Sequence, residues 1–128
     1  MLDLNGPFTW QRIDCNPVGF GPSIRNRCGF FVIENKQNLV SNEYYVHVYC
    51  GNYLSAAQDI FLNDHWKGII ASNSAKNEKM QVAWQQVKNN IAIKRGHFSQ
   101  VVFNGELFIF GGECDRKRFS EMYKVLLQ

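Results

Sequence analysis

The sequence predicts an all-β chain built from short antiparallel strands, and three observations lead to this fold class. Aromatic residues make up 14% of the 128 residues, with ten Phe and five Tyr, and such a composition favours sheet over helix. A strong hairpin signal stands near the C-terminal end of the sequence, where Asn104-Gly105 separates two apolar runs. The third observation is that one order of elements occurs twice along the chain.

The first half of the chain supplies the elements of the first occurrence. A strand led by Trp10 is expected over residues 10–13, followed by strands over residues 30–33 and 44–49. Cys50-Gly51 ends the last of these, and after a loop residues 60–66 predict a further strand. A helix over residues 55–62 is the weaker alternative there.

The middle of the chain has two interpretations. Five apolar residues follow helical spacing, and Ser72 to Ser74 could cap such a helix. However, Trp84-Gln85-Gln86-Val87 matches Trp10-Gln11-Arg12-Ile13, which favours a strand over residues 84–87. The strand is preferred, and a helix within residues 74–91 is the alternative. The helical pattern consists of Met80, Ala83, Trp84, Val87 and Ile91.

The clearest element is a hairpin of residues 101–103 and 106–110. Asn104-Gly105 between these runs predicts a type I′ turn, which needs positive φ at both central residues. Both strands are apolar nearly throughout, whereas a half-exposed sheet would alternate between apolar and polar residues. We therefore expect both faces of this hairpin to be covered.

Gly111-Gly112 end the hairpin, and a basic loop and a strand over residues 119–127 follow. This order repeats that of the first half: Cys50-Gly51 corresponds to Gly111-Gly112, and residues 60–66 correspond to residues 119–123. Repeats of about this length are typical of propellers and arrays, whose units bury their faces by stacking on neighbours.

These residues resemble the kelch repeat. Its pattern runs from a Trp-led strand through a loop with Arg and a Gly-His pair to an apolar hairpin that ends in Gly-Gly. A strand that carries Asn-Asp, or a relative of it, before an aromatic residue then follows. The second unit matches with Trp84, Arg95-Gly96-His97, Asn104-Gly105, Gly111-Gly112 and residues 119–123; the first matches with Trp10, Gly21-Pro22 with Arg25, Gly29-Phe30, residues 46–51 and Leu62-Asn63-Asp64-His65-Trp66.

The resemblance implies kelch-type β-propeller blades, which are four-stranded antiparallel sheets arranged radially around a channel. Residues 1–128 would form one kelch-repeat segment, with a first unit at about 10–69 and a second at 84–128. Kelch propellers usually have five to seven blades, so two units give an incomplete ring. A longer parent chain, further copies of this chain or a partner would complete it.

Composition argues against several classes of function. The net charge of +3 is spread along the chain, with its densest patch at residues 116–118, whereas nucleic-acid and membrane surfaces need a larger clustered excess. The four cysteines form no CxxC pair and have no metal-ligand spacing with the three histidines, so no metal and no cofactor are predicted. The N-terminal residues lack the pattern of a secretory signal, and the expected location is cytoplasmic.

Arg25 and Arg95 are the candidate binding residues. Each precedes a strand in a loop that, in a propeller, can approach the channel, where a guanidinium could bind a carboxylate or an acidic peptide. The favoured alternative is structural, with each arginine bonding to blade carbonyls. His97 is expected to be a packed, hydrogen-bonded residue rather than a base, the tryptophans are expected in the core, and no catalytic residues are predicted.

The expected function is a protein-protein interaction module that contacts a protein partner through its inter-strand loops. Substrate recognition for a ubiquitin ligase and scaffolding are the roles that the kelch resemblance implies. Part of a kelch-like propeller enzyme, an oxidase or a lyase, is the alternative from another class. A truncated repeat fragment without independent function is the third reading.

Overall fold

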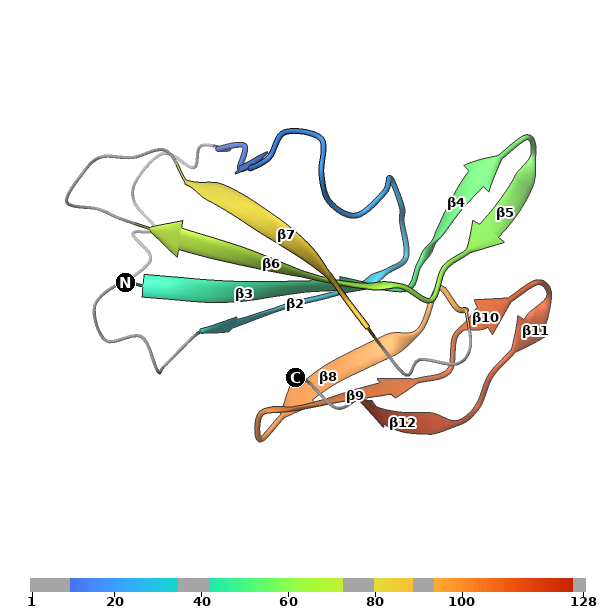
Figure 1. Cartoon of the computed structure of the whole chain (residues 1–128). Helices are drawn as coiled ribbons and strands as arrows, with labels where there is room; N and C mark the ends of the chain where they lie inside the picture. Colours follow the sequence, from blue (N-terminus) through green and yellow to red (C-terminus); the bar gives the residue numbers. More distant parts are fainter. Residues whose placement is uncertain (1–9, 35–41, 73–79, 89–93, 126–128) are drawn as a thin grey trace.

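The computed structural model describes residues 10–34, 42–72, 80–88 and 94–125, and these residues form an all-β structure without helices (Figure 1). Two multi-stranded sheets lie against each other, and each carries a short two-stranded hairpin. In Figure 1 both hairpins extend toward the same side of the view.

The first sheet has the strand order β1-β7-β6-β3-β2. Strands β2, β3, β6 and β7 form an antiparallel meander, and β1 pairs in parallel with β7. The hairpin β4-β5 is inserted between β3 and β6. The bounds are Asp14–Cys15 for β1, Gly29–Glu34 for β2, Asn42–Tyr49 for β3, Asn52–Ser55 for β4, Gln58–Phe61 for β5, His65–Ser72 for β6 and Gln81–Val87 for β7.

The second sheet has the order β12-β9-β8 and repeats the first part of this meander. The hairpin β10-β11 is inserted between β9 and β12, as β4-β5 is inserted between β3 and β6. The bounds are Ser99–Phe103 for β8, Glu106–Phe110 for β9, Glu113–Cys114 for β10, Lys117–Arg118 for β11 and Met122–Val125 for β12. Among the described residues the second sheet has no counterpart of β7.

The backbone repeats in detail where each inserted hairpin begins. Gly51 and Gly112 have φ angles of 94° and 97°. The Leu62 N–H donates to the Gly51 carbonyl at 2.9 Å, and the Phe119 N–H donates to the Gly112 carbonyl at 2.9 Å. The predicted correspondence of Cys50-Gly51 with Gly111-Gly112 is therefore confirmed.

The residues that precede each sheet also correspond, but not as the sequence suggested. Gly96 bridges Glu113, and its counterpart in the first unit is Asn26, which bridges Asn52. The sequence placed Gly29-Phe30 at this position, which is wrong by three residues. Gly29 lies within β2 instead, where an added Cβ would collide with the ring of Tyr49.

Four predicted elements are confirmed. The strands expected over residues 30–33 and 44–49 lie within β2 and β3. The hairpin β8-β9 turns through Asn104 and Gly105 with φ angles of 50° and 73°, as a type I′ turn requires. Residues 84–87 lie in strand β7, where Trp84 pairs with Gly68 of β6, so the helical alternative is wrong there. Residues 73–79 and 89–93 lie outside the described residues.

Four predicted elements are wrong in whole or in part. Residues 55–62 are not helical; they contain the β4-β5 turn, with positive φ at Ala56 and Ala57. The predicted strand over residues 60–66 ends at Phe61 and resumes at His65, because the intervening residues connect the hairpin to the sheet.

Residues 10–13 are not in a strand, and β1 begins at Asp14. The predicted strand over residues 119–127 is confirmed only for Met122–Val125: residues 119–121 are not in a strand, and residues 126–127 lie outside the described part.

The sequence units and the sheets are offset by one strand. Trp84 was expected to lead the second unit, 84–128, yet β7 pairs with β6 and completes the first sheet. The boundary between the sheets therefore falls after Val87.

The core lies between the two sheets. Phe31 and Tyr49 from the first sheet pack against Leu107 and Ile109 from the second. Tyr49 is 1% exposed, and its ring stacks on Phe98 with the centroids 5.4 Å apart. Burial of these apolar faces is the main source of stability for the contact.

Two tryptophans lie on the opposite face of the first sheet, on β6 and β7. Trp66 meets Phe20 edge-on with the ring centroids 5.6 Å apart. Trp84 lies over Gly68, where an added Cβ would stand 2.9 Å from the indole. Both tryptophans are half-buried, as a packing role requires, but Trp10 is fully exposed, which is contrary to its expected place in the core.

The second sheet departs from expectation on its outer face. Residues directly opposite one another in an antiparallel ladder share a face, so Val101, Phe103 and Phe110 lie on one side of this sheet. They are 58%, 64% and 47% exposed, whereas Leu107 and Ile109 on the other side are buried. The prediction that both faces are covered is therefore wrong, because no described residue packs over the outer face.

Candidate interaction site

The side chain of Arg25 is buried and forms an ion pair with Asp64 through both guanidinium Nη atoms. Its Nη1 donates to Asp64 Oδ1 at 2.6 Å and to the Cys50 carbonyl at 3.0 Å, and its Nη2 donates to Asp64 Oδ2 at 2.9 Å. The Arg25 side chain is only 4% exposed. The fork of the guanidinium thus joins the loop before β2 to the loop before β6.

Asp64 is held on both oxygens. Trp66 Nε1 donates to Oδ2 at 2.8 Å, in addition to the two bonds from Arg25. Burial of the carboxyl group would raise its pKa, but the hydrogen bonds from Arg25 and Trp66 outweigh burial and lower the pKa below its ordinary value. Asp64 is therefore a fixed anion at neutral pH.

Arg95 is the counterpart of Arg25, and it is 2% exposed. Its Nη1 donates to the Gly111 carbonyl at 3.1 Å, as Arg25 donates to the carbonyl of Cys50. The guanidinium also lies over the rings of Phe119 and Tyr123, 4.8 and 5.0 Å from their centroids. Burial of both arginines favours the structural role, and ligand binding by them stays a prediction.

His97 is more exposed than expected. Its side chain is 47% exposed, and its Nδ1 lies 3.0 Å from Glu113 Oε1. The residue has a φ of 60°, and its counterpart Arg27 has a φ of 54°. His97 is hydrogen-bonded, as predicted, but it lies at the surface rather than in the packed interior.

A buried histidine pair lies on the inner face of the first sheet. His47 Nδ1 is 2.8 Å from His65 Nε2, and His47 stacks on Phe31 with the ring centroids 4.6 Å apart. Burial lowers the pKa of His47 to about 4, and the charges of His65 and Lys67 add to this effect. Burial also lowers the pKa of His65, since the opposing effect of Asp64 is smaller.

Both histidines are therefore neutral near pH 7, with one ring N–H donated to the other ring. The sequence showed them as two separate histidines without a metal pattern. Their pairing depends on the β3-β6 register, which sequence spacing does not reveal.

Tyr49 links the two sheets through a polar contact. Its hydroxyl donates to the side-chain carbonyl of Gln100, whose Nε2 donates to the Phe30 carbonyl at 2.5 Å. Burial raises the pKa of the Tyr49 hydroxyl, and it also raises the pKa of the neighbouring Cys50 thiol to about 12. Cys50 is accordingly a protonated, unreactive thiol, and all four cysteines are free.

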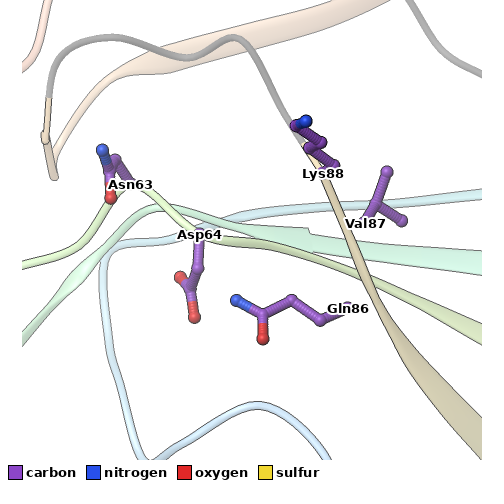
Figure 2. A pocket seen from close by; sticks show the side chains of 5 residues that line it. All are labelled: Asn63, Asp64, Gln86, Val87 and Lys88. Atoms are coloured by element: carbon purple, nitrogen blue, oxygen red, sulfur yellow. The ribbon is translucent and has the colours of Figure 1, made fainter.

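An open pocket of about 430 Å³ lies where the loop before β6 meets the end of β7. Figure 2 shows the Asp64 carboxylate and the Gln86 amide on either side of this space. The lining consists of Asn63, Asp64, Gln86, Val87 and Lys88. It thus brings together one carboxylate, one ammonium group and two amides, and its acidic wall is fixed by Arg25.

Sequence reasoning missed most of this pocket. Asn63-Asp64 was recognised only as part of a repeat pattern, and Gln86 and Lys88 carry no motif. Lys88 and Asp64 line the same pocket because β6 and β7 are paired, with His65 opposite Val87.

In the described part of the chain, no three His, Cys, Asp or Glu side chains are placed to hold a metal ion. The same residues contain no helix with the length and hydrophobicity needed to cross a bilayer. Comparison of the chain with protein-family models, curated proteins and solved structures found no match. The kelch resemblance therefore stays a prediction.

Proposed function

We propose that this chain is a kelch-type protein-interaction module that binds an extended peptide segment of a protein partner through its inter-strand loops. The observation that carries this proposal is the open polar pocket at the loop end of the first sheet, where Asp64 is held rigidly by Arg25.

The strand arrangement supports the kelch-type part of the proposal. Strands β2, β3, β6 and β7 form the four antiparallel strands of the five-stranded first sheet, an arrangement like that of a propeller blade, and β8, β9 and β12 repeat the first three of these strands. Each sheet carries the same inserted hairpin and the same glycine position. A repeated blade that presents its loops at one end is a suitable scaffold for a binding surface.

The lining of the pocket favours a peptide over a small metabolite. Small-molecule sites are mostly apolar and enclosed, whereas four of the five residues here are polar or charged. Asp64 can accept further N–H groups, and Lys88 can donate to a carbonyl or a carboxylate. Groups of both kinds alternate along an extended peptide.

A peptide-display selection on the immobilised 128-residue chain tests the proposal. Enriched peptides would be synthesised and titrated by calorimetry against the wild-type chain and against Gln86→Ala and Lys88→Ala. We expect each substitution to weaken binding by roughly fivefold to tenfold, the effect of one lost hydrogen bond to a polar group.

Gln85→Ala is the matched control. Gln85 is exposed and adjacent in β7, but its side chain points to the other face of the sheet and does not line the pocket. Selection of no consensus peptide, or an equal loss of affinity in Gln85→Ala and Gln86→Ala, would contradict binding at this pocket.

A further inference from the structure

Among the described residues, the main-chain hydrogen bonds between the two units all involve one segment of the second unit, residues 95–97. The Gly51 N–H donates to the Arg95 carbonyl at 2.8 Å, and the Arg95 N–H donates to the Leu62 carbonyl at 3.2 Å. The His97 N–H then donates to the Arg27 carbonyl at 3.2 Å. We call these three backbone hydrogen bonds the joint. They hold the segment of residues 95–97 against the first unit.

The second unit presents the same three groups again. Gly112, Phe119 and His97 are the counterparts of Gly51, Leu62 and Arg27, with the same turn conformations and the same supporting bonds. Within the described residues, no main-chain group bonds to the Gly112 N–H or to the carbonyls of Phe119 and His97. The second unit therefore carries the receiving half of a joint without an occupant.

The side chains around the vacant half repeat as well. In the first sheet Phe31 is 7% exposed and Tyr49 is 1% exposed, because the second sheet covers them. Tyr49 and Phe110 each precede the corresponding glycine positions, and they pair with Gly29 and Ser99 respectively. Phe31 and Val101 each lie two residues after these partners, so Val101 is the counterpart of Phe31. Both counterparts are about half exposed, so the outer face of the second sheet is the same docking face, apolar and open.

The inserting half of a joint is also present on this chain, on its first unit. Arg25 and Asn26 are the counterparts of Arg95 and Gly96. Phe30 and Val32, 55% and 51% exposed, lie on the face of the first sheet that corresponds to the covered face of the second. Each copy thus has a receiving surface on one unit and an inserting surface on the other.

We propose that two copies of this chain associate head to tail through this same joint. The backbone from Arg25 to Arg27 of one copy bonds to Gly112, Phe119 and His97 of the next, and Phe30 and Val32 cover the open apolar face. The occupant is a second copy because residues 25–27 of this chain repeat the arginine contact, the β-bridge and the positive φ of residues 95–97, which already fill the joint inside it. The inference does not rest on the peptide pocket.

Because the two surfaces differ, the contact is heterologous, and each copy can bind one neighbour on each side. The assembly then closes into a ring or grows into an open chain. In both cases its mass is a multiple of 14.8 kDa that exceeds a single copy.

Sedimentation velocity of the 128-residue chain over a wide range of concentration tests the proposal. Phe103→Asp disables the receiving surface, and Val32→Asp disables the inserting surface. Both residues are exposed in the single copy, so the fold should survive, and circular dichroism checks this. Each variant should remain monomeric, since an unpaired carboxylate would be buried in the contact.

The decisive measurement is a mixture of the two variants. Phe103→Asp keeps its inserting surface and Val32→Asp keeps its receiving surface, so an equimolar mixture should form a one-to-one dimer that cannot grow. Leu54→Asp is the matched control, because Leu54 is an exposed apolar residue on the β4-β5 hairpin, outside the joint, and this variant should assemble like wild type.

A wild-type chain that stays monomeric at high concentration would overturn the proposal. Assembly that Leu54→Asp reduces as much as Phe103→Asp would also overturn it, since nonspecific apolar association would then be the cause. A mixture that stays monomeric would reject the head-to-tail contact in favour of one between identical surfaces. None of these outcomes bears on peptide binding, which Gln86→Ala measures separately.

Discussion

The two sheets have the same backbone plan but opposite distributions of polar and apolar side chains on the corresponding face. The first sheet buries His47, Tyr49 and His65. At the corresponding positions the second sheet has Phe108, Phe110 and Met122, of which the last two are exposed. Burial here is decided by the neighbour that covers a face rather than by the hydrophobicity of the residues on it.

The buried polar groups of the first sheet are tolerated because they bond to one another. The two histidines share a hydrogen bond, and Tyr49 bonds to Gln100 of the second sheet. At the positions of the second sheet that correspond to these residues, Phe108, Phe110 and Met122 are apolar and need no hydrogen-bond partner. The polar inner face of the first sheet is therefore specific for the second sheet, whereas the apolar outer face of the second sheet remains able to bind a further neighbour.

The largest effect is expected from truncating an aromatic residue at the contact between the sheets and its counterpart on the outer face of the second sheet. Tyr49→Ala should reduce the free energy of unfolding by about 4 kcal/mol, because it removes a buried aromatic ring at the contact between the sheets. Phe110→Ala should cost no more than about 1 kcal/mol in the monomer, because Phe110 is half exposed. Urea unfolding of both variants measures the difference, and equal losses would contradict the comparison.

The next effect concerns the carboxylates that stand at corresponding positions before β6 and β12. Asp64→Ala should reduce the free energy of unfolding by about 3 kcal/mol, since it leaves the buried guanidinium of Arg25 without its counter-ion. Glu121 is exposed, and Glu121→Ala should change the free energy of unfolding by no more than about 0.5 kcal/mol. Thermal unfolding compares them; a loss of similar size in both would mean that the Arg25–Asp64 pair contributes little.

The smallest effect is the pH dependence that the histidines give to the first sheet. His47 has a pKa of about 4 in the folded chain and an ordinary value of 6.5, so the unfolded chain binds more protons between these values. Stability is therefore complete above pH 6.5 and falls as the pH falls toward 4. The expected loss is on the order of 2 kcal/mol between about pH 7 and about pH 5.

The second sheet suggests the control for this prediction. His47→Phe combined with His65→Met places the residues of the second sheet, Phe108 and Met122, at the corresponding positions of the first. The double variant should lose most of the dependence of stability on pH in this range, measured by urea unfolding at each pH. An unchanged slope would show that other groups cause it.

Sequence alone predicted the elements that carry a local signal. Asn104-Gly105 specifies its turn because both residues tolerate positive φ, and the strand of Trp84 was found from its match to Trp10. The β4-β5 turn was missed because it places Ala56 and Ala57 at positive φ, where neither residue gives a turn signal. A helix over residues 55–62 was the weaker alternative there, and the β4-β5 pairing excludes it.

The site was less predictable than the fold. Arg25 and Arg95 could be singled out by their place before a strand, but the partner of Arg25 is Asp64, which lies 39 residues away. The pocket depends on the pairing of β6 with β7, and the exposure of Phe103 depends on the absence of a covering neighbour among the described residues. Such properties belong to the tertiary arrangement, and residue patterns do not encode them locally.

The one-strand offset between sequence units and sheets has a consequence for how such a chain can lengthen. Strand β7 completes the first sheet, and the chain then runs on to Arg95, which docks the second unit. A duplicated sequence unit would thus contain the last strand of the preceding sheet and the first strands of a new sheet. Every added unit would be linked to the preceding unit by the covalent chain as well as by non-covalent contacts. A chain lengthened by duplication would therefore have no boundary between sheets that is held by non-covalent contacts alone.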